Sequence, residues 1–409
     1  MTKQKVFDVA VVGAGVFGAW TAYLLRLAGA EVILLDAYGA GNSRASSGGE
    51  SRIIRMGYGP DEVYTRMAKR SLPRWLELSG HDVSSVTRQQ PSLLFQRTGV
   101  LWLAREEDDY CEATINTLKR TSVPFERLTG GELSQRYSQL ELRAGSWGIL
   151  EPDSGVLMAR RAVRAVVGKA TAAGVTYQEE AIRPPEDTGE AQAQASGSRT
   201  VVDSQGSVEY LKTNRADRIL ARDFVFACGP WLPKLFPSVL GGLIHVTRQE
   251  VVFFGVPAGD NRFGHEQMPA WIDFNDLVYG IPSIDNRGFK VAIDRHGSDF
   301  DPDCHDRVVS ASGLMAVRSY LAERMPALSE APVTETRVCQ YENTSSGDFL
   351  IDRHPGYENV WFVGGGSGHG FKHGPAVGES VVALLKERTQ LESRFTLTTR
   401  EKVQQRKVF

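Results

Sequence analysis

A glycine-rich turn near the start of the chain has the residue types and spacing that bind a dinucleotide. An apolar, β-branched run over 6–12 leads into Gly13, Gly15 and Gly18, the pattern G-x-G-x-x-G. These glycines permit a tight turn, a close approach of backbone to a pyrophosphate and close packing of a helix, whose amides face the phosphates. Asp36 ends the next predicted strand, where a carboxylate accepts hydrogen bonds from an adenosine ribose. The unit therefore predicts nucleotide binding.

Two arginines stand in the mostly apolar run RIIR, at positions Arg52 and Arg55. A buried guanidinium is costly without an anionic partner. Its planar fork can give a carboxylate two parallel hydrogen bonds. The pair therefore indicates either an anionic ligand or structural salt bridges, and the residues alone leave both open.

Cys339 lies in a polar run, two residues before Tyr341. Residues two apart on a strand share a face, so the thiol and the phenol are expected to point the same way. The four cysteines lie far apart and form no C-x-x-C pair, which argues against a disulfide framework and a structural zinc site. We interpret Cys111, Cys228 and Cys304 as small buried hydrophobes.

A lysine and an aspartate share one face of another predicted strand. The run GFKVAIDRHG alternates so that Lys290, Ala292 and Asp294 lie on the same side. Lys290 is either a functional cation or an exposed lysine on an edge strand, and the residues alone leave both open.

No pattern in the chain predicts a metal site. His369 and His373 are four residues apart, but in a glycine-rich loop rather than on a helix. Asp301, Asp303 and Asp306 lack the glycine and glutamate of a calcium-binding loop and are expected to form a solvated turn.

Hydrophobic patterning supplies the elements that would position these residues. A strand, a helix and a second strand over 6–36 form a βαβ unit, and β-branched runs at 219–227 and 359–363 indicate further buried strands. This pattern predicts an α/β fold in which a nucleotide domain built from separated segments holds an inserted, β-rich domain. Helices are predicted over 61–78, 157–173, 307–323 and from about 375, a strand over 175–181, strand-rich sequence over 245–293, a hairpin over 92–104 about Gly99, and a surface excursion over 186–207.

The composition is typical of a soluble globular protein with a sizeable core. The 409 residues are 42% hydrophobic and 23% charged, with a net charge of -2. This balance argues against broad electrostatic capture of nucleic acid or of an anionic membrane. The chain shows no long uninterrupted apolar stretch and no cleavable signal pattern, so we expect a cytoplasmic protein without a membrane span.

The four glycine, arginine and cysteine patches together resemble the family of D-amino-acid-oxidase-like FAD amine oxidases, and within it the group of monomeric sarcosine, N-methyltryptophan and pipecolate oxidases. The similarity spans most of the chain and is most specific at GAGVFG with Asp36, SSGGESRIIRMGYG, RVCQYENTSSGDFLIDRHP and GGGSGHGFKHG. It implies a glutathione-reductase-type FAD-binding Rossmann domain with an inserted β-sheet substrate domain. The implied limits are 1–85, 150–235 and 335–390 for the FAD domain, 86–149 and 236–334 for the substrate domain, and 391–409 for a tail.

The resemblance also assigns roles to the cationic residues. It implies that Arg52 contacts the flavin region and that Arg55 and Lys372 bind a substrate carboxylate. Lys290 matches the lysine of the family that activates oxygen.

For the cofactor, the resemblance implies FAD, covalently attached at Cys339, with Tyr341 in the active site. The helix from about 375 would aim its N-terminus at the flavin pyrimidine. The implied FAD-binding set is Gly13, Gly15, Val16, Phe17, Gly18, Asp36, Arg44, Ser47, Gly48, Cys339, Gly366, Gly368, Gly370 and Lys372.

Two positions depart from the family pattern. Sarcosine oxidases have histidines where this chain has Gly48 and Asp294, which removes bulk and basic groups around the substrate and argues against sarcosine itself. Asp294 would face a cationic or hydroxylated side chain of the substrate, or else pair with Lys290 or Arg295.

The expected activity is oxidation of a secondary or N-alkyl amino acid to an imine, with O2 reduced to H2O2, by a monomer or small homo-oligomer. One alternative is a dehydrogenase of the same fold that passes electrons to another carrier. The others are an NAD-dependent dehydrogenase and a protein that binds flavin without catalysis. Peroxide formation, bound yellow colour and bleaching by amines distinguish the four.

Overall fold

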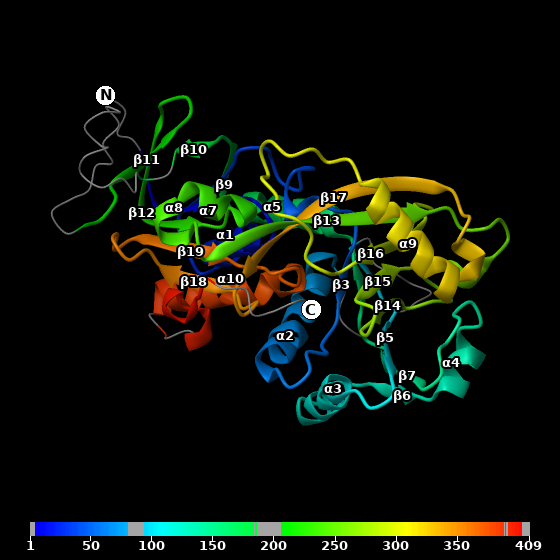
Figure 1. Ribbon diagram of the computed structural model, residues 1–409. Helices are drawn as coiled ribbons and strands as arrows, with labels where there is room; N and C mark the ends of the chain where they lie inside the picture. The colour runs from blue at the N-terminus through cyan, green and yellow to red at the C-terminus, as the bar shows by residue number, and fades with distance from the viewer. Residues whose placement is uncertain are drawn as a thin grey trace.

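Two eight-stranded sheets form the framework of the protein (Figure 1). The computed structural model describes residues 5–80, 94–183, 185, 206–387, 389 and 392–402. A third, three-stranded sheet joins β3 (Arg52–Ile54), β8 (Gly155–Leu157) and β4 (Phe95–Gln96).

The first sheet has a parallel centre built from segments that are far apart in the chain. β1 (Val6–Val12) pairs in parallel with β2 (Val32–Asp36) and β12 (Arg218–Phe226), and β12 pairs in parallel with β19 (Val360–Gly364). The carboxyl ends of parallel strands meet at one edge, so the loops after β1, β12 and β19 lie together, where α/β sheets bind ligands. The other strands are β9 (Thr176–Glu179), β10 (Ile182–Arg183), β11 (Tyr210–Thr213) and β18 (Leu350–Arg353).

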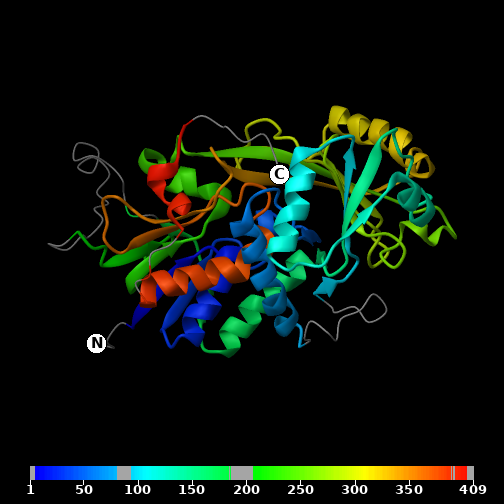
Figure 2. The same cartoon turned by 90° about the horizontal axis from the view of Figure 1, so that it is seen from below.

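Helices from three parts of the chain cover the first sheet. α1 (Val16–Leu27) packs between α10 (Gly374–Val382) and α5 (Ala159–Ala172), and the three helices lie side by side in Figure 2. α2 (Glu62–Leu78) packs on α10 and begins at Asp61, whose side chain accepts from the amides of the first turn.

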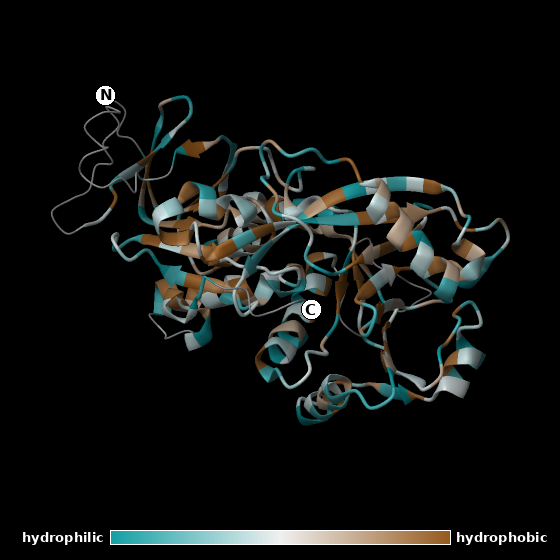
Figure 3. Ribbon diagram, viewed as in Figure 1, coloured by the Kyte–Doolittle hydropathy of each residue, from teal (hydrophilic) through white to brown (hydrophobic). Residues whose placement is uncertain are grey.

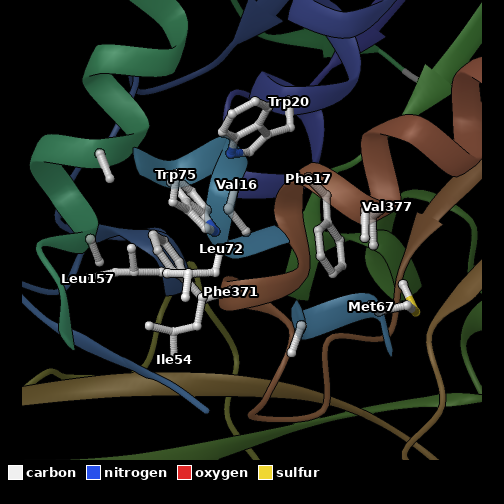
Figure 4. Packing of buried hydrophobic residues seen from close by; sticks show 14 of the residues in the cluster. Val16, Phe17, Trp20, Ile54, Met67, Leu72, Trp75, Leu157, Phe371 and Val377 are labelled. Atoms are coloured by element: carbon white, nitrogen blue, oxygen red, sulfur yellow. The ribbon is translucent and has the colours of Figure 1, made fainter. Parts of the chain in front are cut away.

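Aromatic rings join these helices to the glycine-rich loop near the C-terminus. Trp75 of α2 stacks on Phe371 with centroids 5.5 Å apart, and Trp20 of α1 packs edge-on to Trp75 at 5.1 Å (Figure 4). The indole nitrogen of Trp75 also donates to the carbonyl of Lys372 at 2.9 Å. The backbone that carries Lys372 is therefore anchored to the core.

The second sheet is mostly antiparallel, and its two long strands run along one side. β17 is its edge strand and pairs only with β13 within the sheet. Its strands, in spatial order, are β17 (Val333–Thr344), β13 (Ile244–Phe254), β16 (Phe289–Ile293), β15 (Val278–Ile281), β14 (Ala270–Asp273), β5 (Val100–Arg105), β7 (Ser146–Glu151) and β6 (Glu126–Leu128). The remaining helices are α3 (Asp109–Arg120), α4 (Gly130–Arg136), α7 (Leu232–Leu235), α8 (Pro237–Leu240) and α9 (Ala311–Arg324).

Most predicted elements are confirmed, and two are corrected. The hairpin over 92–104 is wrong within the described residues 94–104, because β4 pairs with β8 whereas β5 pairs with β7 and β14. Gly99, with φ of +74°, turns the chain from one sheet into another. The helix predicted from 307 begins at Ala311, because Ser310 caps it by accepting from the Gly313 amide at 3.0 Å.

The predicted domain limits remain a prediction, and one of them falls inside an element. Residue 335 lies within β17, which belongs to the second sheet although its C-terminal half borders the first. The surface excursion predicted over 186–207 lies, apart from its last two residues, outside the described residues.

Hydrophobic residues gather along the strands and on the packed sides of the helices, as Figure 3 shows. Within the described ranges, no helix has the length and apolar character needed to cross a bilayer. None of the four cysteines forms a disulfide; Cys111 is buried as predicted, but Cys228 is half-buried and Cys304 is exposed. The interpretation of Cys304 as a buried hydrophobe is wrong, because it lies in the solvated turn beside Asp301.

Candidate active site

Two adjoining cavities lie where the first and second sheets meet. The larger, of about 360 Å³, extends from the turn after β1 to the glycine-rich loop after β19. The smaller, of about 100 Å³, is lined by side chains of the second sheet and of β3. Residues common to both walls mark the junction: Arg52, Cys339, Tyr341, Gly368 and Phe371.

The larger cavity begins at glycines that no other residue could replace. Gly13 has φ of +103°, and a Cβ there would lie 2.4 Å from the carbonyl oxygen of Ala227. A Cβ on Gly18 would lie 1.8 Å from the carbonyl oxygen of Gly13. Both distances are far below van der Waals contact, so glycine at these two positions lets the backbone form this turn. The turn brings the start of α1 against the strand ends.

Polar groups surround the N-terminus of α1. The Asp36 carboxylate accepts from the Ala14 amide at 2.7 Å, and the Ser47 hydroxyl accepts from the Val16 amide at 3.1 Å. Burial raises the pKa of Asp36 against the opposing effect of these backbone hydrogen bonds. An acceptor and a set of helix amides therefore stand at the end of this cavity, as the sequence predicted.

At the junction, Arg52 lies against Cys339. Its guanidinium donates to the carbonyl oxygens of Ser51 at 2.8 Å and Ser46 at 2.5 Å, and lies 3.5 Å from the Cys339 sulfur. Cys339 and Tyr341 both line the two cavities, which agrees with the shared face predicted for them. The edge of β17 away from β13 meets two loops, since the Ser46 hydroxyl donates to the Gln340 carbonyl at 3.0 Å and the Ser367 amide donates to the Glu342 carbonyl at 3.1 Å.

Arg55 is buried in the smaller cavity without an acidic partner. Its side chain is 6% exposed, donates to the carbonyl of Gly57, and lies over the rings of Tyr58 at 4.4 Å and Trp102 at 4.5 Å. Among the described residues it forms no ion pair with a carboxylate. A buried, uncompensated guanidinium is costly, so this cation is suited to an anionic ligand.

A fully buried carboxylate holds the surroundings of Arg55 in place. Glu151 accepts from the amides of Met56 at 2.7 Å and Gly57 at 3.0 Å. It also accepts from the Trp102 indole at 2.9 Å and from a serine hydroxyl. Glu151 therefore fixes both the carbonyl that Arg55 bonds and the ring on which it lies.

Lys372 belongs to a buried hydrogen-bond network centred on the Tyr58 hydroxyl. Its ammonium donates to Tyr58 at 2.7 Å and to the carbonyl of His369 at 2.9 Å. His369 Nε2 lies 2.9 Å from the Gly347 carbonyl, which can only accept, so in the neutral ring Nδ1 accepts from Tyr58 at 3.2 Å.

The second histidine completes this network. His373 Nε2 then donates to the Tyr58 oxygen at 2.7 Å. Burial, with the charges of Lys372 and Arg55, holds the pKa of His373 well below its usual range, so this ring is neutral. The histidines thus orient Tyr58 and, through it, the Lys372 ammonium.

Lys290 is buried, not an exposed lysine on an edge strand. β16 lies between β13 and β15, and the side chain is 2% exposed. Its ammonium donates to the Ser51 carbonyl at 3.1 Å and lies 5.5 Å from the centre of the Tyr279 ring. Burial and the nearby Arg52 charge hold the pKa of Lys290 well below its usual range.

Asp294 is one of two acidic residues that line the smaller cavity, with Asp273. Its carboxylate accepts from the Tyr341 hydroxyl at 2.8 Å, so it pairs with a phenol. Burial and the Asp294 charge raise the pKa of Tyr341 well above its usual range. Lys290 and Asp294 both line this cavity, in agreement with the face predicted for them.

Three residues of the predicted FAD set, Gly18, Arg44 and Gly48, lie outside the walls of both cavities. Arg44 lies over the Tyr38 ring at 4.9 Å. A Cβ on Gly48 would lie 1.8 Å from the carbonyl oxygen of Asn42. The idea that Gly48 opens space around the substrate is therefore corrected, because its missing side chain serves local packing.

Several residues of the site were missed by sequence analysis. Tyr58 and Glu342 stand within the patches that carry the resemblance, so their position there was an available signal. Trp102, Glu151 and Tyr279 reach the site only through pairing within the second sheet, and no local pattern indicates them.

Comparison with known proteins gives the class of protein. Residues 8–384 match the family model described as DAO, FAD dependent oxidoreductase, and the chain belongs to this family. It is 30% identical over 391 residues to monomeric sarcosine oxidase of Bacillus sp. (strain B-0618), covering 92% of each chain. It is 26% identical over 392 residues to N-methyl-L-tryptophan oxidase of Salmonella arizonae, covering 94% of this chain and 95% of that protein.

A solved structure agrees in fold. L-proline dehydrogenase from P. horikoshii superposes with a TM-score of 0.78 at 20% identity, covering 97% of this chain and 98% of the other. The predicted FAD-binding Rossmann architecture with a second β-sheet is confirmed. The protein is an FAD-dependent oxidoreductase that acts on amino groups.

The larger cavity fits FAD. Gly15 keeps side-chain atoms away from the α1 amides, which can face a pyrophosphate, and Asp36 would supply the acceptor for a ribose. At the other end, Cys339 and Tyr341 stand at the junction with the substrate-sized cavity, where a flavin ring would meet its substrate.

Proposed function

We propose that this protein oxidises a secondary or N-alkyl amino acid to an imine and transfers the electrons to O2. The observation that carries the proposal is Arg55, buried without an acidic partner in the cavity that also holds Lys372. Two cations in one small, poorly solvated space favour a carboxylate, and a guanidinium can bind it through two hydrogen bonds. The relatives named sarcosine oxidase and N-methyl-L-tryptophan oxidase support the N-alkyl amino acid class.

The reaction balances as removal of two electrons and two protons from the C–N bond of the amine. When bound, FAD accepts a hydride equivalent from the α-carbon and later supplies two electrons to O2. Arg55 and Lys372 fix the carboxylate, which orients the α-carbon toward the junction of the cavities. Water then hydrolyses the imine, and O2 with two protons becomes H2O2.

Lys290 is proposed to supply the positive charge that oxygen reduction requires. Its amino group is buried in the smaller cavity near Arg52, where an anion developing from O2 would be poorly solvated. Burial lowers the pKa of Lys290, and the developing anion would favour the protonated amino group, whose charge stabilises it in return. This favours an oxidase over a dehydrogenase that passes its electrons to another carrier.

Asp294 is proposed to select the substrate side chain or amine. It places a carboxylate in the same cavity as two carboxylate-binding cations. A cationic or hydroxylated group on the amino acid would complement it, whereas a second acidic group would be repelled.

The direct test is an anaerobic screen of N-methyl, cyclic and basic amino acids for bleaching of the bound flavin. Bleaching by N-alkyl or cyclic amino acids, followed by stoichiometric H2O2 on admission of air, is the expected result. Reduction without peroxide would assign a dehydrogenase, and no reduction by any amino acid would overturn the proposal. Acid precipitation in the same preparation tests Cys339, since flavin left wholly in the supernatant means that it is not covalently bound.

A further inference from the structure

Glu342 is a buried carboxyl group in the wall of the cofactor cavity with one oxygen unused. It follows Tyr341 on β17, and only 9% of the residue is exposed. Oε1 accepts from the Gly366 amide at 3.2 Å. Oε2 is buried and has no hydrogen-bond partner in the structure.

The surroundings of Glu342 contain backbone rather than compensating charge. A Cβ on Gly364 would lie 3.3 Å from Oε2, one on Gly229 3.9 Å from it, and one on Gly366 3.2 Å from Oε1. Among the described residues, no lysine, arginine or histidine forms an ion pair with this carboxyl. Burial raises the pKa of Glu342 to about 7, and two glycine amides are the groups that lower it. A carboxyl in this position needs a hydrogen-bond donor from a ligand.

The chemistry of FAD restricts which of its groups can be that donor. Its phosphates and the flavin carbonyls only accept hydrogen bonds, so they would oppose the ionised carboxyl and could pair only with the protonated one. The donors in its middle are the hydroxyls of the ribityl chain, whereas the adenosine ribose and the flavin ring lie toward the two ends.

Position within the cavity selects among these donors. Asp36 stands at the end of the cavity where the ribose is expected, and Cys339 with Tyr341 stands at the flavin end. Cys228 lines the same cavity, and its thiol is near enough to both Asp36 and Glu342 for their charges to raise its pKa. Glu342 therefore faces the stretch that joins the pyrophosphate to the ring.

From this geometry we propose that Oε2 of Glu342 accepts a hydrogen bond from a ribityl hydroxyl of FAD. Glu342 is then a cofactor-positioning residue that holds the sugar alcohol chain on the glycine backbone of 364–366. The inference depends on FAD binding and not on which amino acid is oxidised.

The test measures flavin affinity rather than turnover. In the full chain carrying Cys339→Ser, which keeps the flavin releasable, apoprotein is titrated with FAD and with analogues that each lack one ribityl hydroxyl. The Glu342→Ala variant is compared with the protein that keeps Glu342, and the dissociation constant of each flavin is measured by quenching of its fluorescence. We expect Glu342→Ala to weaken FAD about tenfold or more, and to cause little further loss for the one analogue that lacks the partner hydroxyl.

Two further variants serve as controls for this test. Asp36→Asn is the matched control, because it should weaken FAD and all ribityl analogues by the same factor. Glu342→Gln keeps an acceptor oxygen and the side-chain volume, so it should retain most of the affinity and serves if the alanine variant does not fold. Equal losses for FAD and every analogue in Glu342→Ala, no loss of FAD affinity in that variant, or a loss in Glu342→Gln as large as for Asp36→Asn would overturn the proposal.

Discussion

The two cavities of this protein are built in different ways. The cofactor cavity is formed mainly by backbone: the turn at Gly13–Gly18, the amides of α1 and the glycines after β19. The substrate-sized cavity is formed by charged and aromatic side chains from segments far apart in the chain, such as Arg55, Lys290 and Lys372. Backbone shape therefore sets which cofactor is held, whereas side-chain charge sets what is oxidised and which acceptor is used.

The largest effect should come from adding side-chain atoms to the backbone-built cavity. Gly18→Ala would place a methyl group 1.8 Å from the Gly13 carbonyl oxygen. We expect loss of bound flavin and a fall in unfolding free energy of about 3 kcal/mol or more. The control is Gly168→Ala in α5, where a Cβ meets nothing within 4 Å, and which should stabilise the helix by up to about 1 kcal/mol. Equal behaviour of the two variants in urea unfolding would contradict the comparison.

In the side-chain-built cavity, Lys290→Met should leave the fold and flavin content intact. We expect the rate of flavin reoxidation by O2 to fall about 10²-fold or more, with anaerobic reduction by substrate changed only a few-fold. Stopped-flow measurement of the two half-reactions checks this, with Lys169→Met on α5 as the control. Unchanged reoxidation would remove Lys290 from the oxygen reaction.

Tyr58→Phe should give a smaller effect in the same cavity. It removes the oxygen to which Lys372 and His373 donate at 2.7 Å. Because Lys372 loses its orienting partner, we expect carboxylate inhibitors to bind about tenfold more weakly. Tyr64→Phe is the matched control, since the Tyr64 hydroxyl donates to Asp348 and not to Lys372. A loss of equal size in both variants would mean that the hydrogen bond between Lys372 and Tyr58 is not what orients the carboxylate-binding cation.

The smallest effect is a pH dependence in the cofactor cavity of the apoprotein. The pKa of Glu342 is about 7 in the folded chain and about 4.3 in an unfolded one. The folded state therefore binds more protons in this window, and the stability from Glu342 is present below pH 4.3 and lost as pH rises toward 7.

Glu342→Gln should remove this pH-dependent contribution, because the amide does not titrate in this range. Asp36 and Cys228, which line the same cavity, stay in place in both proteins. The measurement is urea unfolding of apoprotein at intervals from pH 4.5 to 7.5. A wild-type minus variant difference that does not change with pH would contradict the assigned burial.

The cofactor half of the protein could be predicted from sequence because its signals are local. The glycine spacing, the helix of α1 and the carboxylate of Asp36 all occur within one βαβ unit, and the structure confirms each. Cys339 and Tyr341 were indicated by the resemblance, and the two-residue period of a strand predicted that they share a face, as it did for Lys290 and Asp294.

The rest depends on contacts that no short pattern records. Glu151 accepts from the amide of Gly57, which is 94 residues away in the chain, and from the indole of Trp102. The pairing of β5 with β7 brings Trp102 and Glu151 together, and these contacts hold the groups around Arg55. The burial of Lys290 follows from the position of β16 inside the sheet. The packing role of Gly48 follows from the carbonyl of Asn42, which leaves no room for a side chain. The failed hairpin has the same cause, since β4 and β5 each pair with strands distant in sequence.

The central claim is that the side-chain-built cavity recognises an amino acid through its carboxylate at Arg55. The decisive measurement is the anaerobic rate of flavin reduction by an N-alkyl amino acid and by the amine that lacks its carboxylate, in wild type and Arg55→Met, with Arg66→Met as a surface control. We predict a preference for the amino acid of about 10²-fold or more in wild type and in the control, which largely disappears in Arg55→Met. Equal reduction by the amino acid and the amine in wild type, or an unchanged preference in Arg55→Met, would contradict the account.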